Sequence, residues 1–339
     1  MSKRKAGSPI PELIGVLAAD RGSVTAGEVA DAAGVTRQAA HYHLVRMVRD
    51  GALRRVGAGR GSRYVPDADL VLTYPLEGLE EDQVWNDVVG DVPKIRDVPS
   101  NMVAVMRYAF TEMLNNAIDH SGGTEARVKV RARDPLSFEI SDDGIGAFRH
   151  VRERFALPDD LAALQQLSKG RETTAPDRHS GEGIFFASKA VDLFELDANR
   201  LRWIVDNRRA DQSIGEAPEH AGTRVRCDLD PGARRSLEEV FAPFVEEGSL
   251  RFDRTVVRLA LFETEAGFVS RSEAKRLGTR LERFREAVID FTGVDDVGLA
   301  FVDELFRVWA VEHPETHLVP VNASPVVERL VRRAMTSTA

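Results

Sequence analysis

The strongest constraint on the fold is a helical stretch, residues 100–121, in which two polar side chains accompany a long apolar face. The apolar positions recur at helical spacing: Met102, Met106, Ala109, Phe110, Met113, Leu114, Ala117 and Ile118. Glu112 and Asn116 are four residues apart, so one helical turn places them on the same side. A carboxylate that positions water, beside an amide oxygen that binds a hard cation, suits phosphoanhydride hydrolysis. Taken alone, such a pair is more often a solvated helix surface.

Three glycine-containing turns follow this stretch. The alternating residues 137–141 predict a strand that ends in Asp142-Asp143-Gly144-Ile145-Gly146, where glycine allows close approach of a ligand beside a carboxylate. Gly181 and Gly183 precede a helical pattern whose free N–H groups can receive phosphate. Gly222-Thr223 then begins a further strand. Each turn is a weak signal, and their order is the informative feature.

In this order, Glu-x-x-x-Asn-Ala-x-x-His, Asp-x-Gly-x-Gly, Gly-x-Gly and Gly-Thr resemble the N, G1, G2 and G3 boxes of the GHKL (Bergerat-fold) ATPases. That superfamily includes gyrase-, Hsp90-, MutL- and histidine-kinase-type ATPases. The resemblance implies an α/β sandwich with a mixed sheet covered by helices, and it implies ATP and Mg²⁺ as cofactors. We therefore expect residues 67–231 to form a GHKL ATP-binding domain.

The resemblance also implies roles for individual residues. Glu112 would act as general base or water positioner, Asn116 as the Mg²⁺ ligand, and Asp142 as acceptor for the adenine amino group. The remaining expected contacts are Gly144 and Gly146 beside the base, Thr223 with a water near adenine, and Gly181, Gly183 and Lys169 at the phosphates.

Two features separate this chain from the best-known members of that superfamily. The G2 box reads Gly-Glu-Gly-Ile-Phe-Phe, with an aromatic residue where many relatives have a third glycine. Of the eight histidines, none lies in a two-helix dimerisation segment upstream of the ATP domain, so histidine autophosphorylation is not expected. ATP hydrolysis remains a candidate activity.

The first 65 residues differ from the rest in charge. They carry a net charge of +6, whereas the remainder of the chain carries −14 within the total of −8. Only this first part suits a polyanion. Helical patterns at 10–19, 26–33 and 36–50 are joined by a turn, Ala33-Gly-Val-Thr36, in which Gly34 supplies the bend and Thr36 can cap the next helix.

That arrangement, followed by two short strands around a glycine-rich turn, resembles a winged helix-turn-helix. We expect residues 1–66 to bind DNA through Arg37, Gln38, His41 and Tyr42 on the third helix and through Arg60 and Arg63 on the wing. The same helix should turn Val35, Leu44, Val45 and Val48 toward the core. A winged helix that docks proteins is the alternative.

Residues 232–339 alternate between strand and helix patterns, which predicts a small α/β domain. Asp290-Phe-Thr-Gly-Val and the amphipathic helix after it resemble STAS-like domains appended to GHKL ATPases. Gly298-Leu299-Ala300 occupies the place where phosphorylated STAS antagonists carry a serine. We expect this domain to bind a partner protein or to self-associate, and we expect a homodimer.

These parts define an α+β multidomain protein: a winged helix, a GHKL α/β sandwich and a STAS-like domain. No apolar run is long enough to span a bilayer, and we expect a cytoplasmic protein without membrane contact. The single cysteine, Cys227, should be buried and structural. The function predicted is ATP-controlled transcriptional regulation. The alternative is an anti-sigma-like Ser/Thr kinase or partner switch that uses the winged helix for docking.

Overall fold

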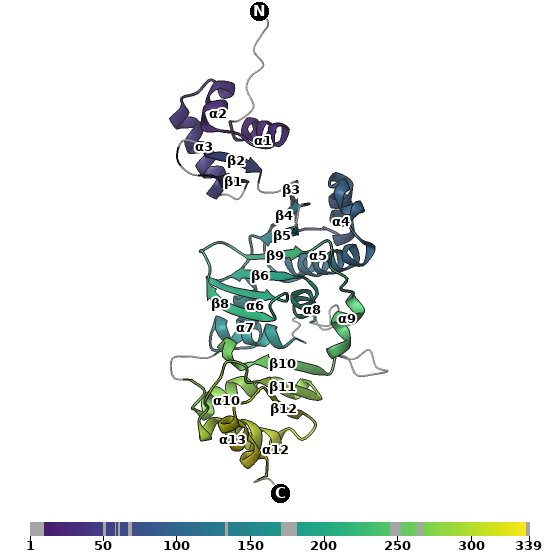
Figure 1. Ribbon diagram of the computed structural model, residues 1–339, viewed down its shortest axis with the longest axis vertical. Helices are drawn as coiled ribbons and strands as arrows, with labels where there is room; N and C mark the ends of the chain where they lie inside the picture. The colour runs from purple at the N-terminus through teal and green to yellow at the C-terminus, as the bar shows by residue number, and fades with distance from the viewer. Residues whose placement is uncertain are drawn as a thin grey trace, which may run out of the picture.

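Three β-sheets, each built from one part of the chain, organise this computed structural model (Figure 1). The structure describes residues 10–49, 52–57, 59, 62–66, 70–132, 135–170, 182–244, 252–262 and 267–336. In chain order the sheets have two, seven and three strands. Figure 1 shows the two-stranded sheet near one end of the molecule, the large sheet in the middle and the three-stranded sheet at the other end.

The N-terminal part is a unit of three helices and a two-stranded antiparallel sheet. Its elements are α1 (Ile10–Arg21), α2 (Ala26–Ala33), α3 (Arg37–Arg49), β1 (Leu53–Val56) and β2 (Arg63–Pro66). Thr25 and Glu28 form a capping box that starts α2, and Gly34 ends it with φ 65°. The Thr36 hydroxyl accepts the amide of Ala39 at 3.2 Å, which confirms the predicted cap of α3.

The core of this unit agrees with the sequence prediction except at one residue. Leu44 on α3 is fully buried among Ile14, Val29 and Tyr64, and Val35 and Val48 pack against them. Val45 was expected in the same core, but 49% of it is exposed. Its place on the helix is one residue, or about 100°, beyond Leu44, which turns it away from the buried side.

The large sheet has the strand order β3-β4-β5-β9-β6-β7-β8. Its strands are β3 (Leu70–Pro75), β4 (Glu125–Arg131), β5 (Leu136–Asp142), β6 (Leu193–Ala198), β7 (Leu201–Asp206), β8 (Asp211–Glu216) and β9 (Thr223–Leu229). Every neighbouring pair is antiparallel, so the expectation of a mixed sheet was wrong. Hairpins join β4 to β5 and β6 to β7 to β8, and β9 enters between β5 and β6 against the direction of both.

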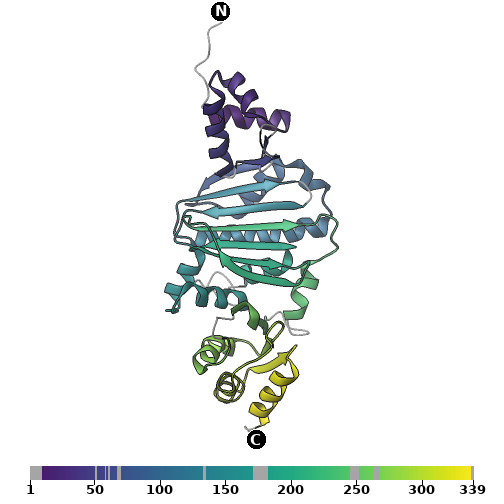
Figure 2. The ribbon, with the colours of Figure 1, turned by 60° about the vertical axis from the view of Figure 1, so that its left-hand side comes forward.

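Helices of this middle part pack against the sheet or against one another. They are α4 (Glu81–Asp91), α5 (Ser100–His120), α6 (Ala147–Arg154), α7 (Asp160–Lys169) and α8 (Gly183–Ala190). Figure 2 shows α5 crossing behind the sheet, whose other face is turned to the viewer. The buried residues of α5 include seven of the eight apolar positions predicted, and the eighth, Ile118, packs against the core. Cys227 on β9 is fully buried, as expected, and burial raises the pKa of its thiol.

The C-terminal part is a small α/β unit with a parallel sheet in the order β10-β11-β12. Its strands are β10 (Arg254–Arg258), β11 (Glu286–Asp290) and β12 (His317–Val321), and its helices include α10 (Arg271–Gly278), α11 (Leu299–Asp303), α12 (Ala310–Glu312) and α13 (Pro325–Thr336). A π-helical segment, Glu304–Trp309, joins α11 to α12. The alternation of strands and helices confirms the predicted small α/β arrangement.

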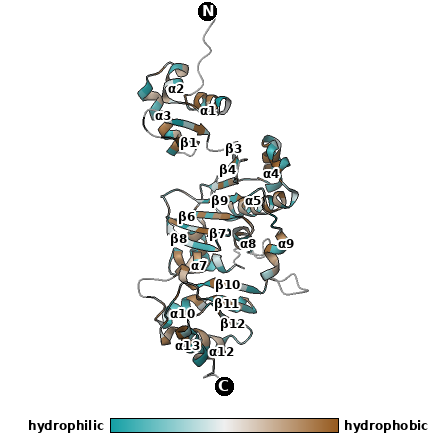
Figure 3. Ribbon diagram, viewed as in Figure 1, coloured by the Kyte–Doolittle hydropathy of each residue, from teal (hydrophilic) through white to brown (hydrophobic). Residues whose placement is uncertain are grey.

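Apolar residues of the middle and C-terminal parts belong to one continuous core. The connection between them contains α9 (Leu237–Phe241) and the 3-10 turn Ala242–Phe244. In Figure 3, hydrophobic and hydrophilic residues are mixed in all three parts of the molecule. Among the described helices, none combines the length and the apolar character needed to cross a bilayer.

Candidate functional site

Helix α5 presents the first two candidate residues, Glu112 and Asn116, on one side. Both side chains are half-buried. The Asn116 side-chain nitrogen Nδ2 donates to the backbone oxygen of Glu112 at 2.8 Å. With the amide nitrogen turned to the helix, the side-chain oxygen Oδ1 is the atom presented away from the helix backbone. This orientation suits an oxygen ligand for a hard cation.

The start of α8 lies directly against Glu112. Gly183 is the first residue of that helix, and a Cβ built on it would collide with the Glu112 carboxylate. A larger residue at this position would therefore displace the Glu112 carboxylate from its present place. The contact brings the Glu112 carboxylate beside the backbone N–H groups that begin α8.

The Asp142 carboxylate organises the turn at the end of β5. Its Oδ1 accepts the amide of Gly144 at 2.9 Å and the amide of Thr223 at 3.1 Å. A Cβ on Gly222 would collide with Asp142, so β9 can approach this closely only through glycine. Burial raises the pKa of Asp142 and outweighs the hydrogen bonds that lower it. A carboxylate fixed through one oxygen can accept an amino group through the other.

Gly144 and Ser121 join this turn to the end of α5. A Cβ on Gly144 would collide with the Ser121 carbonyl oxygen, and the amide of Ile145 donates to that same oxygen at 3.0 Å. Asp142 is thus attached, through two neighbouring residues, to the helix that carries Glu112 and Asn116. Gly144 was expected to make room for a base, whereas here its missing side chain admits the backbone of Ser121.

Gly146 has a similar structural partner, Asn199, on the β6–β7 hairpin. Asn199 Nδ2 donates to the Ile145 carbonyl and its Oδ1 accepts the Arg149 amide, each at 2.9 Å. A Cβ on Gly146, which has φ 89°, would lie 2.5 Å from Asn199 Oδ1. Asn199 and Ser121 were not identified from the sequence. Asn199 follows an alternating strand and has the left-handed φ of a turn, but no local pattern shows what its side chain reaches.

Thr223 and Asp143 complete the framework. The Thr223 hydroxyl accepts the amide of Ala147 at 2.9 Å and so attaches β9 to α6. Asp143 accepts the hydroxyl and amide of Thr124, each at 2.6 Å, and the amide of Glu125 at 2.9 Å. These bonds, led by the one from the Thr124 hydroxyl, lower the pKa of Asp143 to about 2. Asp143 therefore holds the turn through Thr124 and Glu125, while Asp142 holds it through Gly144 and Thr223.

Lys169 lies elsewhere. Its ammonium Nζ is 2.8 Å from the carbonyl oxygen of Leu277 and 2.9 Å from that of Thr279, both in the C-terminal part. Only 1% of the residue is exposed. The ammonium therefore binds protein carbonyls in this structure, in place of the phosphate contact that we predicted. Gly181 and Arg60, the two remaining predicted residues of the site and the wing, lie outside the described residues.

The N-terminal helix α3 forms the second candidate surface. Arg37, Gln38, His41 and Tyr42 are all exposed on it, and 64% of Tyr42 is accessible. The His41 ring nitrogen Nδ1 lies 3.1 Å from the hydroxyl of buried Tyr64, which fixes the imidazole from within the domain. Exposed Arg63 donates to the Ser23 hydroxyl at 2.8 Å and lies 3.7 Å from the Glu28 carboxylate.

The oxygen atoms presented by α5 are the groups here that could take part in binding a hard cation. Within the described part of the chain, no group of three or more His, Cys, Asp or Glu side chains could hold a metal ion. Mg²⁺ is commonly bound through one or two protein oxygens together with substrate phosphates and water. Asn116 could supply one such oxygen, and Glu112 lies one helical turn before it.

Comparison with known proteins gives matches at both ends of the chain. Residues 10–65 match the model of the FaeA-like protein family, and residues 273–328 match the model of the STAS-like domain of unknown function (DUF4325). No significant match was found among curated proteins or among solved structures. The C-terminal match confirms the predicted STAS-like character. The two matches together are compatible with a regulatory protein, and both lie outside residues 66–272.

Proposed function

We propose that this protein is a transcriptional regulator in which ATP binding to the middle part controls DNA binding by the N-terminal part. The nucleotide site is that of a GHKL ATPase, formed by Glu112, Asn116 and Asp142. The observation that carries the proposal is the convergence of these residues around α5. Asp142 is joined to Thr223 and Gly144, Gly144 lies against the end of α5, and Glu112 lies against Gly183.

Each residue has a task within this proposal. Asp142 accepts the adenine amino group, because its Oδ1 is already fixed by two backbone amides. Asn116 offers Oδ1 to Mg²⁺, which would supply charge neutralisation at the phosphates. Glu112 positions the attacking water and takes its proton. Its place beside the start of α8 supports this role, because the phosphates would lie at those N–H groups.

DNA binding is supported by a different set of observations. The chain up to residue 65 has a net charge of +6, and α3 exposes Arg37, Gln38, His41 and Tyr42 together. Side chains of this kind at the start of a helix can read base edges in a major groove. The match of residues 10–65 to a family model covers the same helices and wing.

Binding assays with the full-length chain test the proposal. Titration with ATP and ADP, with and without Mg²⁺, should show Mg²⁺-dependent binding of both nucleotides. DNA selected from a random pool should then be bound with different affinity in ATP, in ADP and without nucleotide, because coupling requires unequal affinities in two states. Equal DNA affinity in all three conditions would refute nucleotide control, and absence of ATP binding would refute the nucleotide site.

A further inference from the structure

Helix α8 contacts other segments of the chain at three places: its first residue, its middle and its last turn. Its first residue, Gly183, lies against Glu112 of the candidate nucleotide site. Its middle and its last turn contact the connection to the C-terminal part. Because α8 has eight residues and is only about 12 Å long, a shift at one end moves the other end with it.

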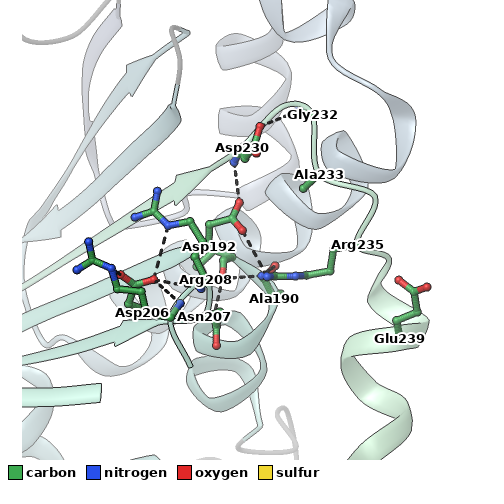
Figure 4. A network of polar contacts seen from close by, with 12 residues as sticks. Ala190, Asp192, Asp206, Asn207, Arg208, Asp230, Gly232, Ala233, Arg235 and Glu239 are labelled. Atoms are coloured by element: carbon green, nitrogen blue, oxygen red, sulfur yellow. Dashed lines mark hydrogen bonds and ion pairs between the residues drawn. The ribbon is translucent and has the colours of Figure 1, made fainter. Parts of the chain in front are cut away.

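The last turn of α8 is capped by Arg235, which belongs to the connection between the two parts (Figure 4). Its Nη1 donates to the carbonyl oxygens of Val191 at 2.8 Å and Ala190 at 3.1 Å. Its Nη2 lies 3.3 Å from the buried carboxylate of Asp192, which also accepts the amide of Asp230 at 2.6 Å. A cation at the carbonyl end of a helix is favourable both for hydrogen bonding and for the helix dipole.

The middle of α8 contributes Phe185 and Phe186 to a cluster of phenylalanine side chains. Both residues belong to the G2 box, which has an aromatic residue where many relatives have a third glycine. Phe185 and Phe186 each lie with their ring centroids 4.9 Å from that of Phe252, which precedes β10. Phe186 also contacts Phe241 of α9 at 4.5 Å, and Phe252 contacts Phe284 at 5.5 Å. The four residues Phe185, Phe186, Phe252 and Phe284 are buried. The aromatic residues at positions 185 and 186 therefore attach α8 to the C-terminal part.

The end of α7 is attached to the same part. Lys169 donates to the Leu277 and Thr279 carbonyls, and its own carbonyl accepts the Thr255 hydroxyl at 2.7 Å. A Cβ on Gly170, the next residue, would lie 2.6 Å from Phe252 and 2.9 Å from Phe185. Two successive elements of the middle part thus meet β10 and its neighbours through tight, buried contacts.

We propose that the connection to the C-terminal part sets the nucleotide affinity of the candidate site by holding α8 against Glu112, with Arg235 as the positioning residue. This inference rests on the proposed nucleotide site. Arg235 holds the carbonyl end of α8, the phenylalanine cluster holds its middle, and Gly183 at the other end contacts Glu112. A ligand of the C-terminal part that displaces these contacts would therefore change nucleotide affinity.

The test compares ATP affinity in the full-length wild-type protein and four variants. Arg235→Met keeps the alkyl stem and removes the cap, Arg235→Lys restores a cation, and Phe252→Leu loosens the aromatic contact. Arg332→Met is the matched control, because Arg332 forms an ion pair with Glu328 on α13 and 70% of its side chain is exposed. Melting of each variant is recorded first, and affinity is measured well below its Tm.

We expect Arg235→Met and Phe252→Leu to raise the Kd for ATP by roughly tenfold, the size of a typical coupling between sites. Arg235→Lys should recover most of the affinity and Arg332→Met should leave it unchanged. Linkage also requires that ATP increase hydrogen-exchange protection of residues 252–258 in the wild type and not in Arg235→Met. A purely structural Arg235 would lower Tm and leave the Kd unchanged.

The outcomes separate this inference from the proposed function. If the wild type binds ATP and both Arg235→Met and Phe252→Leu bind it equally well, the inference is overturned and the nucleotide site stands. An equal loss of affinity in Arg332→Met also overturns it, because the effect is then not specific to α8. If the wild type binds no nucleotide, the proposed site fails and this inference fails with it.

Discussion

Gly183 and the Glu112 carboxylate lie so close together that no larger residue fits at position 183 without displacing one of them. The residue that we assign to water positioning is therefore beside the start of the helix to which we assign phosphate binding. Glu112→Gln keeps the shape of the side chain and removes its negative charge. We expect ATP hydrolysis to fall by at least 100-fold, the typical size of a general-base contribution, with ATP affinity nearly unchanged.

The measurement for Glu112 is phosphate release together with nucleotide binding on the same preparation. Glu80→Gln serves as the control, since Glu80 is an exposed residue that immediately precedes α4. Unchanged hydrolysis in Glu112→Gln would exclude this role for the carboxylate.

Asn116→Ala should remove the magnesium dependence of ATP binding, because the side-chain oxygen that faces away from the helix is lost. Asn115→Ala provides a matched control, because it removes a side-chain amide from the neighbouring residue, which lies about 100° away around α5. Titration of ATP at several Mg²⁺ concentrations distinguishes the two variants. If both variants keep a Mg²⁺ response equal to that of the wild type, Asn116 is not the ligand.

Local periodicity was sufficient to predict α5 and the side on which Glu112 and Asn116 lie. The apolar residues of that helix recur with the period of a helix, and the same positions are buried in the structure. The cap of α3 by Thr36 was predictable for a similar reason, since cap and amide are three residues apart. Features of this kind depend on residues within one or two turns of each other.

Long-range partners could not be predicted in this way. Lys169 was predicted to contact the phosphates, yet its carbonyl partners are 108 and 110 residues away. Asn199 reaches a turn more than 50 positions before it. The arrangement of the large sheet could not be predicted for the same reason. An alternating pattern predicts that a segment forms a strand, whereas the direction of each pair depends on which strands lie side by side.

Gly144→Ala should destabilise the protein, because the added methyl group would overlap the Ser121 carbonyl. The loss should be about 3 kcal/mol in the free energy of unfolding, a value typical of forced overpacking. Gly215→Ala on β8 is the control, since a Cβ there meets nothing within 4 Å. Urea unfolding of both variants measures the difference, and equal stability would show that the turn relaxes without cost.

Asp143 should make stability depend on pH in the acid range. Its pKa is about 2 in the folded protein and about 3.9 in an unfolded chain, so the folded form is favoured when the carboxylate is ionised. This contribution is complete above about pH 4 to 5 and is lost as the pH falls toward 2. Thermal melts of wild type and Asp143→Asn should therefore differ most above pH 5 and converge at lower pH. A constant difference across this range would contradict the assignment.

Arg37→Ala should weaken binding of the full-length protein to duplex DNA in a salt-dependent manner. If the Arg37 guanidinium also neutralises a phosphate beside the groove, its removal lowers the magnitude of the slope of log K against log salt by about 1. Gln38→Ala should leave that slope unchanged and alter the sequences recovered from a random pool, because an amide can pair with a base edge. Arg332→Met removes a positive charge from the opposite end of the chain and is the control for net charge. If it lowers the slope as much as Arg37→Ala does, the effect comes from total charge, and α3 is not the DNA-contacting helix.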